Sequence, residues 1–270
     1  MKKRRQEKRG KGRGWASAKR RDRTPHCSTS KLPRPVIRDA DDHVVVVDKP
    51  AGLTTMRHPH EAAEFGARAQ RFLPKTLADL LPALLPSPAR LRAVHRLDRD
   101  TSGLVVFART AASERGLGQQ FRAHTIDRRY LAVVRGRAKS QRIESSLVED
   151  RGDGRRGSAT KPGGGKRAVT HVRVLEELGD YTLVECRLET GRTHQVRIHL
   201  GEAGTPICGE RVYDRPVHGK PLPDGSAAPR LALHAARLGF KHPATGKWME
   251  WQSPLPLDLQ TLVERLRGRT

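Results

Sequence analysis

The sequence predicts an α+β domain, and three observations support this class. Short β-branched runs and amphipathic stretches follow one another in irregular order, without the regular strand-helix-strand spacing that a parallel sheet requires. The chain has 270 residues, of which 36% are hydrophobic and 4% aromatic, so it can bury one sizeable core. Its first 31 residues contain almost no apolar side chains. We therefore expect a disordered basic arm over residues 1–35 and one domain over residues 36–270.

The first predicted elements are two strands with a helix between them. Residues 43–47 form a β-branched run that a Pro-Gly turn closes, which is typical of a buried strand. Leucines at spacings of three and four predict a helix over residues 76–85, and Pro86 follows as a stop. A Ser-Gly pair then leads into a second strand over residues 104–108.

The middle of the domain is predicted to contain a helix, a strand, a loop and a hairpin. Ser113 is expected to cap the helix, and residues 129–135 form the third strand. Residues 149–167 are rich in Gly and Arg, which predicts a flexible loop. Residues 170–178 and 181–188 predict a hairpin that turns at a Gly-Asp pair.

The last part of the domain begins with a helix that Thr193 is expected to cap and that a glycine at position 204 stops. Residues 216–229 predict a loop, and residues 231–240 predict a strand. An amphipathic pattern over residues 257–266 predicts a closing helix.

The chain is strongly basic. It carries 53 Lys and Arg against 29 Asp and Glu, which gives a formal charge of +24 and a pI near 11.1. Thirteen Lys or Arg and two acidic residues in positions 1–31 give the arm a local charge of +11. Such an excess indicates a polyanionic partner. For the arm itself, a solubilising tail and an RNA contact both remain open, because charge runs bind any phosphate backbone.

Several protein classes are disfavoured by missing patterns. No apolar run reaches the roughly 18 to 20 residues that a membrane span needs, and the N-terminus lacks the apolar region of a signal peptide. Three widely spaced cysteines predict neither disulfides nor a zinc site. The phosphate-binding loop, the dinucleotide fingerprint and the hydrolase nucleophile elbow are absent. We expect a monomeric, cytoplasmic protein that needs no cofactor and no metal.

One polar segment leads straight into the second predicted strand, and it is residues 95–103, His-Arg-Leu-Asp-Arg-Asp-Thr-Ser-Gly. A loop at a strand end suits a carboxylate that is held against a substrate. Asp98 and Asp100 also match the first and third positions of a calcium loop, but the twelfth position, which needs a bidentate Glu, is Arg109. From these residues alone, a plain turn capped by the two aspartates is an equal alternative.

A second polar segment covers residues 191–200, Gly-Arg-Thr-His-Gln-Val-Arg-Ile-His-Leu. If its helix begins as predicted, Arg197 lies one turn in, where a partly buried guanidinium needs a carboxylate partner. The alternative is that Arg197 is a solvent-exposed arginine on the surface of the helix. His194 and His199 lie five positions apart, which suits hydrogen bonding better than a helical zinc pair.

Residues 95–103 resemble the signature motif of the RluA-type pseudouridine synthases over nine contiguous positions. Three further segments agree with that family in order and spacing, and these are residues 47–53, 129–136 and 191–200. The similarity extends from about residue 37 to residue 256. Glu210 stands where the family usually has Asp, and Arg128 stands where Lys is common.

The resemblance implies roles for four residues. Asp98 would be the catalytic aspartate, Tyr130 the tyrosine that packs on the target uracil, and Arg197 the arginine paired with that aspartate. Arg96 is similar to the family residue that helps to displace the base from its helix, so we expect it to bind RNA. The family also implies a central mixed, largely antiparallel sheet flanked by helices and loops. It implies no cofactor, because the isomerisation of uridine neither loses nor gains atoms.

We therefore expect an RNA pseudouridine synthase that acts on uridines in ribosomal or transfer RNA. The alternative is a non-catalytic RNA-binding or ribosome-assembly protein on the same fold. A DNA-binding module is less favoured, because no helix-turn-helix or zinc pattern is present. Lys49 and Arg57 are interpreted as phosphate contacts or solvated charges outside the site. Both covalent pathways, attack on the sugar and formation of a glycal, are left open.

Overall fold

The computed structural model describes residues 34–57, 73–86, 90–161, 163–215 and 219–268. The predicted disordered arm therefore lies outside the described residues, apart from its last two positions. No helix in these segments has the length and the apolar character to cross a lipid bilayer.

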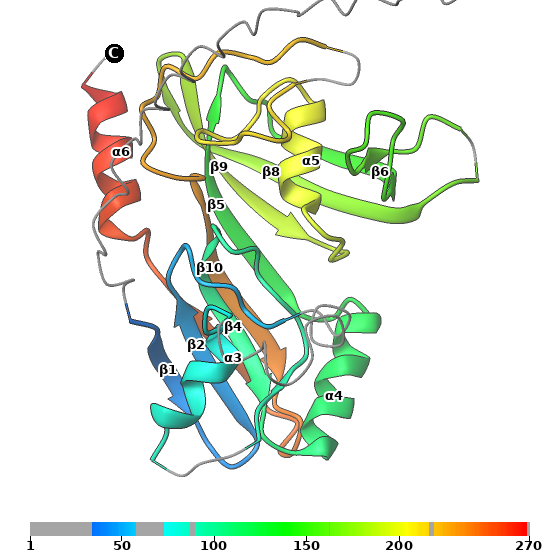
Figure 1. Cartoon of the computed structure of the whole chain (residues 1–270), viewed down its shortest axis with the longest axis vertical. Helices are drawn as coiled ribbons and strands as arrows, with labels where there is room; N and C mark the ends of the chain where they lie inside the picture. Colours follow the sequence, from blue (N-terminus) through cyan, green and yellow to red (C-terminus); the bar gives the residue numbers. More distant parts are fainter. Residues whose placement is uncertain (1–33, 58–72, 87–89, 162, 216–218, 269–270) are drawn as a thin grey trace, which may run out of the picture. The chain divides into compact units, whose positions relative to one another are not determined.

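The described residues build one 11-stranded sheet (Figure 1). Along its main path the strands follow the order β1 (Val36–Ala40), β2 (Val44–Lys49), β4 (Ser102–Ala108), β10 (Leu233–Lys241), β5 (Asp127–Arg135), β9 (Tyr181–Leu188), β8 (Lys166–Leu178), β6 (Gln141–Val148) and β7 (Gly157–Ser158). Two short strands join from the side, β3 (Arg92–Ala93) on β4 and β11 (Trp248–Gln252) on β10. Neighbouring strands are antiparallel except β4 and β10, which are parallel. The predicted mixed, largely antiparallel sheet is confirmed.

The strand predicted over residues 43–47 is β2, and it is buried on both faces. Val45 and Val47 pack in the larger hydrophobic cluster, whereas Val44 and Val46 pack in a second cluster. Successive side chains of a strand point to opposite faces, so an unbroken run of valines marks a strand that is covered on both sides.

The ends of β2 and β4 bring two segments of the sequence together. The two strands are antiparallel, and Lys49 at the end of β2 pairs with Gly103 at the start of β4. The segment that follows β2 and the segment that precedes β4 therefore meet at the same end of the sheet. This end carries the polar residues 95–101.

The α-helices among the described residues are α3 (Leu77–Leu80), α4 (Ala111–Arg122), α5 (Gln195–Glu202) and α6 (Leu257–Arg267). Figure 1 shows α5 beside β8 and α4 at the opposite half of the sheet, next to β4. The helix predicted over residues 76–85 is shorter than expected, because a 3₁₀ turn over Leu81–Ala83 follows α3. Pro82 lies in that turn, and it has no N–H to continue an α-helix.

Two predicted helix caps are wrong. The side chain of Thr110 caps α4, because its Oγ1 accepts the N–H of Ser113 at 3.0 Å, while Ser113 lies inside the helix. The backbone of Thr110 is extended, as an N-cap requires. Helix α5 begins after His194 rather than after Thr193, and His194 has a left-handed φ of 58°. A pattern of residue types does not encode such a conformation in a non-glycine residue.

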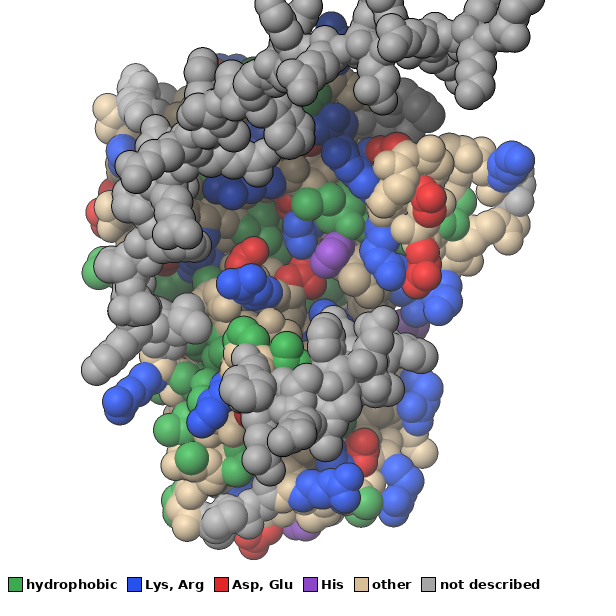
Figure 2. Space-filling model, viewed as in Figure 1, with side chains coloured by type: hydrophobic (Ala, Val, Ile, Leu, Met, Phe, Trp, Pro, Cys, Tyr) green, Lys and Arg blue, Asp and Glu red, His purple; other side chains and the backbone are tan. Residues whose placement is uncertain are grey.

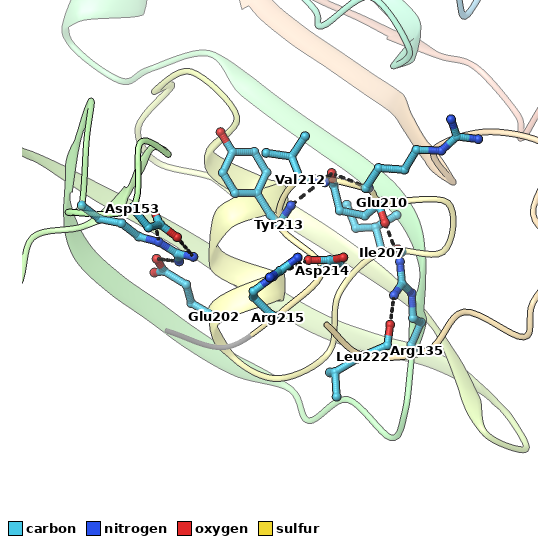
Figure 3. Close-up of polar contacts among 12 residues, drawn as sticks. Arg135, Asp153, Glu202, Ile207, Glu210, Val212, Tyr213, Asp214, Arg215 and Leu222 are labelled. Carbon is cyan, nitrogen blue, oxygen red and sulfur yellow. Dashed lines mark hydrogen bonds and ion pairs between the residues drawn. The ribbon is translucent and has the colours of Figure 1, made fainter. Parts of the chain in front are cut away.

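The flexible loop predicted over residues 149–167 is wrong in part. It contains β7, and its last two residues open β8. The side chain of Arg151 is 5% exposed and forms ion pairs with Asp153 at 3.0 Å and with Glu202 at 3.2 Å. Figure 3 labels Asp153 and Glu202 of this cluster. Because Glu202 is the last residue of α5, the ion pair ties the segment to that helix.

Three longer strands were not predicted, namely β1, β6 and β11. Five of the eight residues of β6 are polar, and exposed side chains alternate with partly buried ones along β1 and β11. Strands with a face toward water lack the continuous apolar run that identified β2. Their existence depends on neighbours that are distant in the sequence.

Candidate active site

The loop before β4 is held in place by Lys49. This lysine is fully buried. Its ammonium donates to the carbonyl oxygens of Pro50, Leu53 and Arg99 at 3.0, 2.8 and 3.1 Å. Burial lowers the pKa of Lys49 to about 7, although the charges of Asp98 and Asp100 act in the opposite direction. The interpretation of Lys49 as a phosphate contact or a solvated charge is therefore wrong. It closes the turn on which Asp98 lies.

Further hydrogen bonds fix the residues on both sides of Asp98. The hydroxyl of Thr55 donates to the carbonyl of Leu97 at 2.8 Å and accepts the N–H of Leu97 at 3.1 Å. The N–H of Gly52 donates to the carbonyl of Arg99 at 2.8 Å. The backbone at Asp98 is thus clamped between two residues bonded to the segment after β2. Arg57, in the same segment, forms an ion pair with Asp79 at 3.0 Å and does not line the cavity described below.

His95 anchors the start of this loop to the sheet. Its Nε2 accepts the N–H of Val106 in β4 at 3.1 Å, and its ring lies 4.7 Å from the ring of Phe121 in α4. Burial lowers the pKa of His95 to about 3, and the positive charge of Arg128 adds to this effect. His95 is therefore neutral near pH 7, which leaves Nε2 free to accept the backbone bond.

Asp98 and Arg197 are in contact, although 99 positions separate them in the sequence. Nη1 of Arg197 donates to Oδ2 of Asp98 at 3.2 Å. The other side of the same guanidinium forms a two-pronged ion pair with Glu210, with Nε–Oε2 at 2.6 Å and Nη2–Oε1 at 2.9 Å. Arg197 is therefore held rigidly by Glu210 while it presents one remaining donor to Asp98.

Glu210 is a buried carboxylate that faces only donors. Its Oε1 also accepts the N–H groups of Val212 and Tyr213 at 2.8 and 3.3 Å (Figure 3). Burial by itself raises the pKa of Glu210, but the hydrogen bonds and the charge of Arg197 outweigh burial and lower it. Burial likewise opposes the charge of Arg197, yet Glu210 and Asp98 raise its pKa overall. The pair is fully ionised near pH 7.

His194 lies on the other side of Asp98. Its Nδ1 is 2.8 Å from the hydroxyl of Tyr213, and its Nε2 is 3.6 Å from Oδ1 of Asp98. Burial lowers the pKa of His194, while the charge of Asp98 opposes that shift. The ring of Tyr213 also lies under the guanidinium of Arg197, at 5.2 Å. Tyr213 therefore links the two side chains that contact Asp98.

A cavity of about 570 Å³ opens in front of these groups. Asp98 and Arg197 line it, and so does Tyr130 from β5, which is 8% exposed. Burial raises the pKa of Tyr130, so its phenol is neutral near pH 7. Arg96 lines the same cavity and is exposed. The structure thus brings together all four residues that the sequence singled out.

The lining of the cavity is positively charged. Its described residues include five arginines but a single carboxylate, that of Asp98. The arginines are Arg96, Arg122, Arg128, Arg192 and Arg197. In the view of Figure 2, Lys and Arg side chains lie on both sides of the middle of the molecular surface, and acidic and His side chains lie between them. An electropositive recess with one ionised carboxylate suits a phosphorylated ligand whose reacting atom meets that carboxylate.

This arrangement supports a reaction in which side chains of the protein act as nucleophile and as proton carrier. An ionised carboxylate can act as a nucleophile or stabilise a developing positive charge, and a neutral phenol can move a proton. Among the described residues, no group of three or more His, Cys, Asp or Glu side chains is arranged to hold a metal ion.

Sequence reasoning missed Glu210, Tyr213 and the role of Lys49. Glu210 was noted only as a departure from the family pattern, and its position after a short buried segment carried no sign of a partner. The lysine in a Lys-Pro-Ala-Gly turn was the available signal for Lys49, because a charged residue between a buried strand and a tight turn requires backbone acceptors.

Known proteins match this chain over most of its length. The family model described as RNA pseudouridylate synthase matches residues 43–202. The ribosomal large subunit pseudouridine synthase D of Zymomonas mobilis is 39% identical over 246 residues, which are 90% of this chain and 76% of the relative. The enzyme of the same name from Nitrosomonas europaea is 40% identical over 238 residues, 84% of this chain and 64% of the relative. The chain therefore spans about two thirds to three quarters of these relatives.

A solved structure has the same fold. Human RNA pseudouridylate synthase domain containing 4 superposes with a TM-score of 0.66 at 25% sequence identity. The match covers 86% of this chain and 92% of the human chain.

Proposed function

The chain belongs to the RNA pseudouridylate synthase family, and we propose that it isomerises uridine in ribosomal RNA to pseudouridine with Asp98 as the catalytic carboxylate. The observation that carries the proposal is the contact of Asp98 with Arg197 at the wall of a cavity that Tyr130 also lines. Relatives named for the large ribosomal subunit support ribosomal RNA over transfer RNA as the substrate.

The reaction breaks one bond to the ribose and forms another. The N1–C1′ bond of uridine breaks, the uracil turns in place, and a C5–C1′ bond forms. The proton on C5 is then lost and N1 gains one, so the product is an isomer of the substrate. A carboxylate next to C1′ can stabilise the electron-poor sugar or bond to it, and both roles fit an oxygen presented at the cavity wall.

Arg197 supports this step by fixing the direction of the Asp98 carboxylate. The guanidinium is already bound to Glu210 at 2.6 and 2.9 Å, so it does not reorganise when the substrate enters. Tyr130 offers its ring as a surface on which the detached uracil can stack. Its neutral phenol is a candidate for the proton transfer from C5.

The target nucleotide has to leave its helix to reach Asp98. The cavity of about 570 Å³ has a size typical of small-ligand sites and can take one nucleotide. Flipping a base costs a few kcal/mol of lost stacking, and a cation that enters the vacated space offsets part of this cost. Arg96 is exposed at the cavity and is the proposed residue for that role.

The test is pseudouridine mapping of total RNA by carbodiimide labelling and primer extension, in cells with and without the gene. We expect loss of at least one site in large-subunit ribosomal RNA, restored by the wild type and by D100N but not by D98N. Asp100 is the matched control, because it lies in the same loop and does not line the cavity. An unchanged map without the gene would refute the proposal in favour of a non-catalytic RNA-binding protein, and restoration by D98N would refute the role of Asp98.

A further inference from the structure

Arg128 is a buried cation in the cavity, and no acceptor among the described residues pairs with it. It is 7% exposed, and its Nε makes no hydrogen bond. Within the described segments, its guanidinium has no ion pair or hydrogen bond of any kind. It lies over the ring of Phe121 at 5.4 Å and against Gly191, where a Cβ would come within 2.4 Å of Nη1. Gly191 therefore makes the space that the guanidinium occupies.

Each of the other buried guanidinium groups described here has at least two acceptors, although the Nε of Arg135 makes no hydrogen bond. Arg135 donates to the carbonyls of Leu222 and Glu210 at 2.6 and 2.7 Å (Figure 3). Arg151 and Arg197 each have two carboxylate partners. Arg128 is the exception, and burial lowers its pKa. A buried charge without a partner destabilises a protein unless a ligand supplies the opposite charge.

The position of Arg128 relates this unmet charge to the substrate. Arg128 and Tyr130 are two residues apart on β5, so their side chains point to the same face and enter the same cavity. Two residues along a strand correspond to about 7 Å. A nucleotide whose base lies on Tyr130 has a phosphate on each side of its ribose, and one of them falls within reach of a guanidinium at this distance.

We infer that Arg128 binds the backbone phosphate on one side of the target uridine. The inference rests on the proposed function and names a contact in that site. A guanidinium binds a phosphodiester through two parallel hydrogen bonds, which gives a fixed geometry as well as attraction. Arg96 and Arg122 also line the cavity but are exposed, so they meet the RNA less selectively. Arg128 instead fixes the position of the RNA strand along the enzyme.

The first test measures RNA affinity between low and high salt for R128M, with an unmodified transcript of large-subunit ribosomal RNA as the probe. Loss of one phosphate contact is expected to reduce the slope of log affinity against log salt by about 0.7 to 0.9. It is also expected to weaken binding roughly 10- to 100-fold at low salt. The matched control is R129M, because Arg129 is the next residue on β5 and is paired with Asp127 at 3.3 Å and Glu185 at 3.6 Å. R129M is expected to keep the wild-type slope.

The second test uses the wild-type protein and therefore does not depend on how R128M folds. Each phosphate that flanks the mapped uridine is replaced in turn by a neutral methylphosphonate in a synthetic stem-loop. We expect one replacement to weaken wild-type binding as R128M does, and to weaken R128M no further. Equal wild-type affinity for both replaced RNAs and the native RNA would overturn the inference. A wild-type slope in R128M would also overturn it and would assign Arg128 to packing on Phe121.

These outcomes are separate from the proposed function. The salt dependence requires binding only, whereas pseudouridine formation requires turnover. A protein that binds RNA through Arg128 but forms no pseudouridine refutes the proposed function. A protein that forms pseudouridine with an unchanged R128M slope refutes only the phosphate contact.

Discussion

The two walls of the cavity differ in how an arginine side chain is paired among the described residues. In the wall formed by α5 and the residues up to Tyr213, Arg197 lies between two carboxylates, and each nitrogen of its guanidinium donates to one of them. In the wall formed by α4 and β5, Arg128 is buried more deeply, and among the described residues its guanidinium has no acceptor and packs on the ring of Phe121 and against Gly191. The first wall is complete without RNA and maintains a fixed geometry. The second is complete only when a phosphate is present.

The largest expected effect on stability and turnover comes from removing Arg197, the arginine that has carboxylate partners. R197M leaves Glu210 buried without its partner and Asp98 without its donor. Breaking a buried ion pair from one side costs about 3–5 kcal/mol of unfolding free energy, so urea unfolding is expected to show a large loss together with loss of turnover. R237M is a suitable control, because Arg237 pairs with Asp127 and Glu250 away from the cavity. A stable, active R197M would contradict the view of this wall as preformed.

The next effect concerns the base of the loop that carries Asp98. K49M removes a donor from three carbonyl oxygens, of which only that of Arg99 keeps another donor among the described residues, the N–H of Gly52, and relief from burying the ammonium offsets part of this cost. We expect a loss of about 2–3 kcal/mol in urea unfolding, with a further decrease in turnover at temperatures where K49M is still folded. Unfolding at the wild-type midpoint would show that Lys49 does not hold the loop.

Only part of this site can be predicted from sequence. Asp98, Tyr130 and Arg197 lie in segments with a recognisable pattern. Their contact depends on the antiparallel pairing of β2 with β4 and on the approach of two segments 99 positions apart. The left-handed backbone at His194 directs its ring toward Asp98, and residue type does not reveal it. Glu210 acts through a buried ion pair, which depends on tertiary packing alone.

The fold shows the same division between local and distant causes. Strands β2 and β4 are buried on both faces and were found from their apolar runs. Strand β6 was missed because its polar residues acquire a strand conformation only by pairing with β8.

A moderate effect is expected from acid. The pKa of His95 is about 3 in the folded chain against 6.5 for a free histidine, so the unfolded chain takes up this proton first as the pH falls. Its contribution to stability is present above pH 6.5 and is lost between pH 6.5 and 3, at no more than about 1.4 kcal/mol per pH unit. H95Q is expected to have a flatter pH dependence of unfolding than the wild type in that range. H124N, at an exposed histidine of the same cavity, should keep the wild-type dependence.

The smallest effect on stability is expected from removing Arg128, the arginine without a carboxylate partner among the described residues. R128M loses the contact with Phe121 but also removes a buried charge that has no partner, so unfolding free energy should change by less than about 1 kcal/mol. The measurement is thermal and urea unfolding in buffer without phosphate, side by side with R197M. A loss as large as that of R197M would show that the two walls do not differ.

The most direct test of Asp98 as the catalytic group is release of tritium from RNA that carries [5-³H]uridine, because isomerisation transfers the C5 proton to water. The account predicts no release by D98N under conditions where the wild type and D100N release tritium, with RNA affinity nearly unchanged in both variants. Release by D98N at the wild-type rate would contradict it.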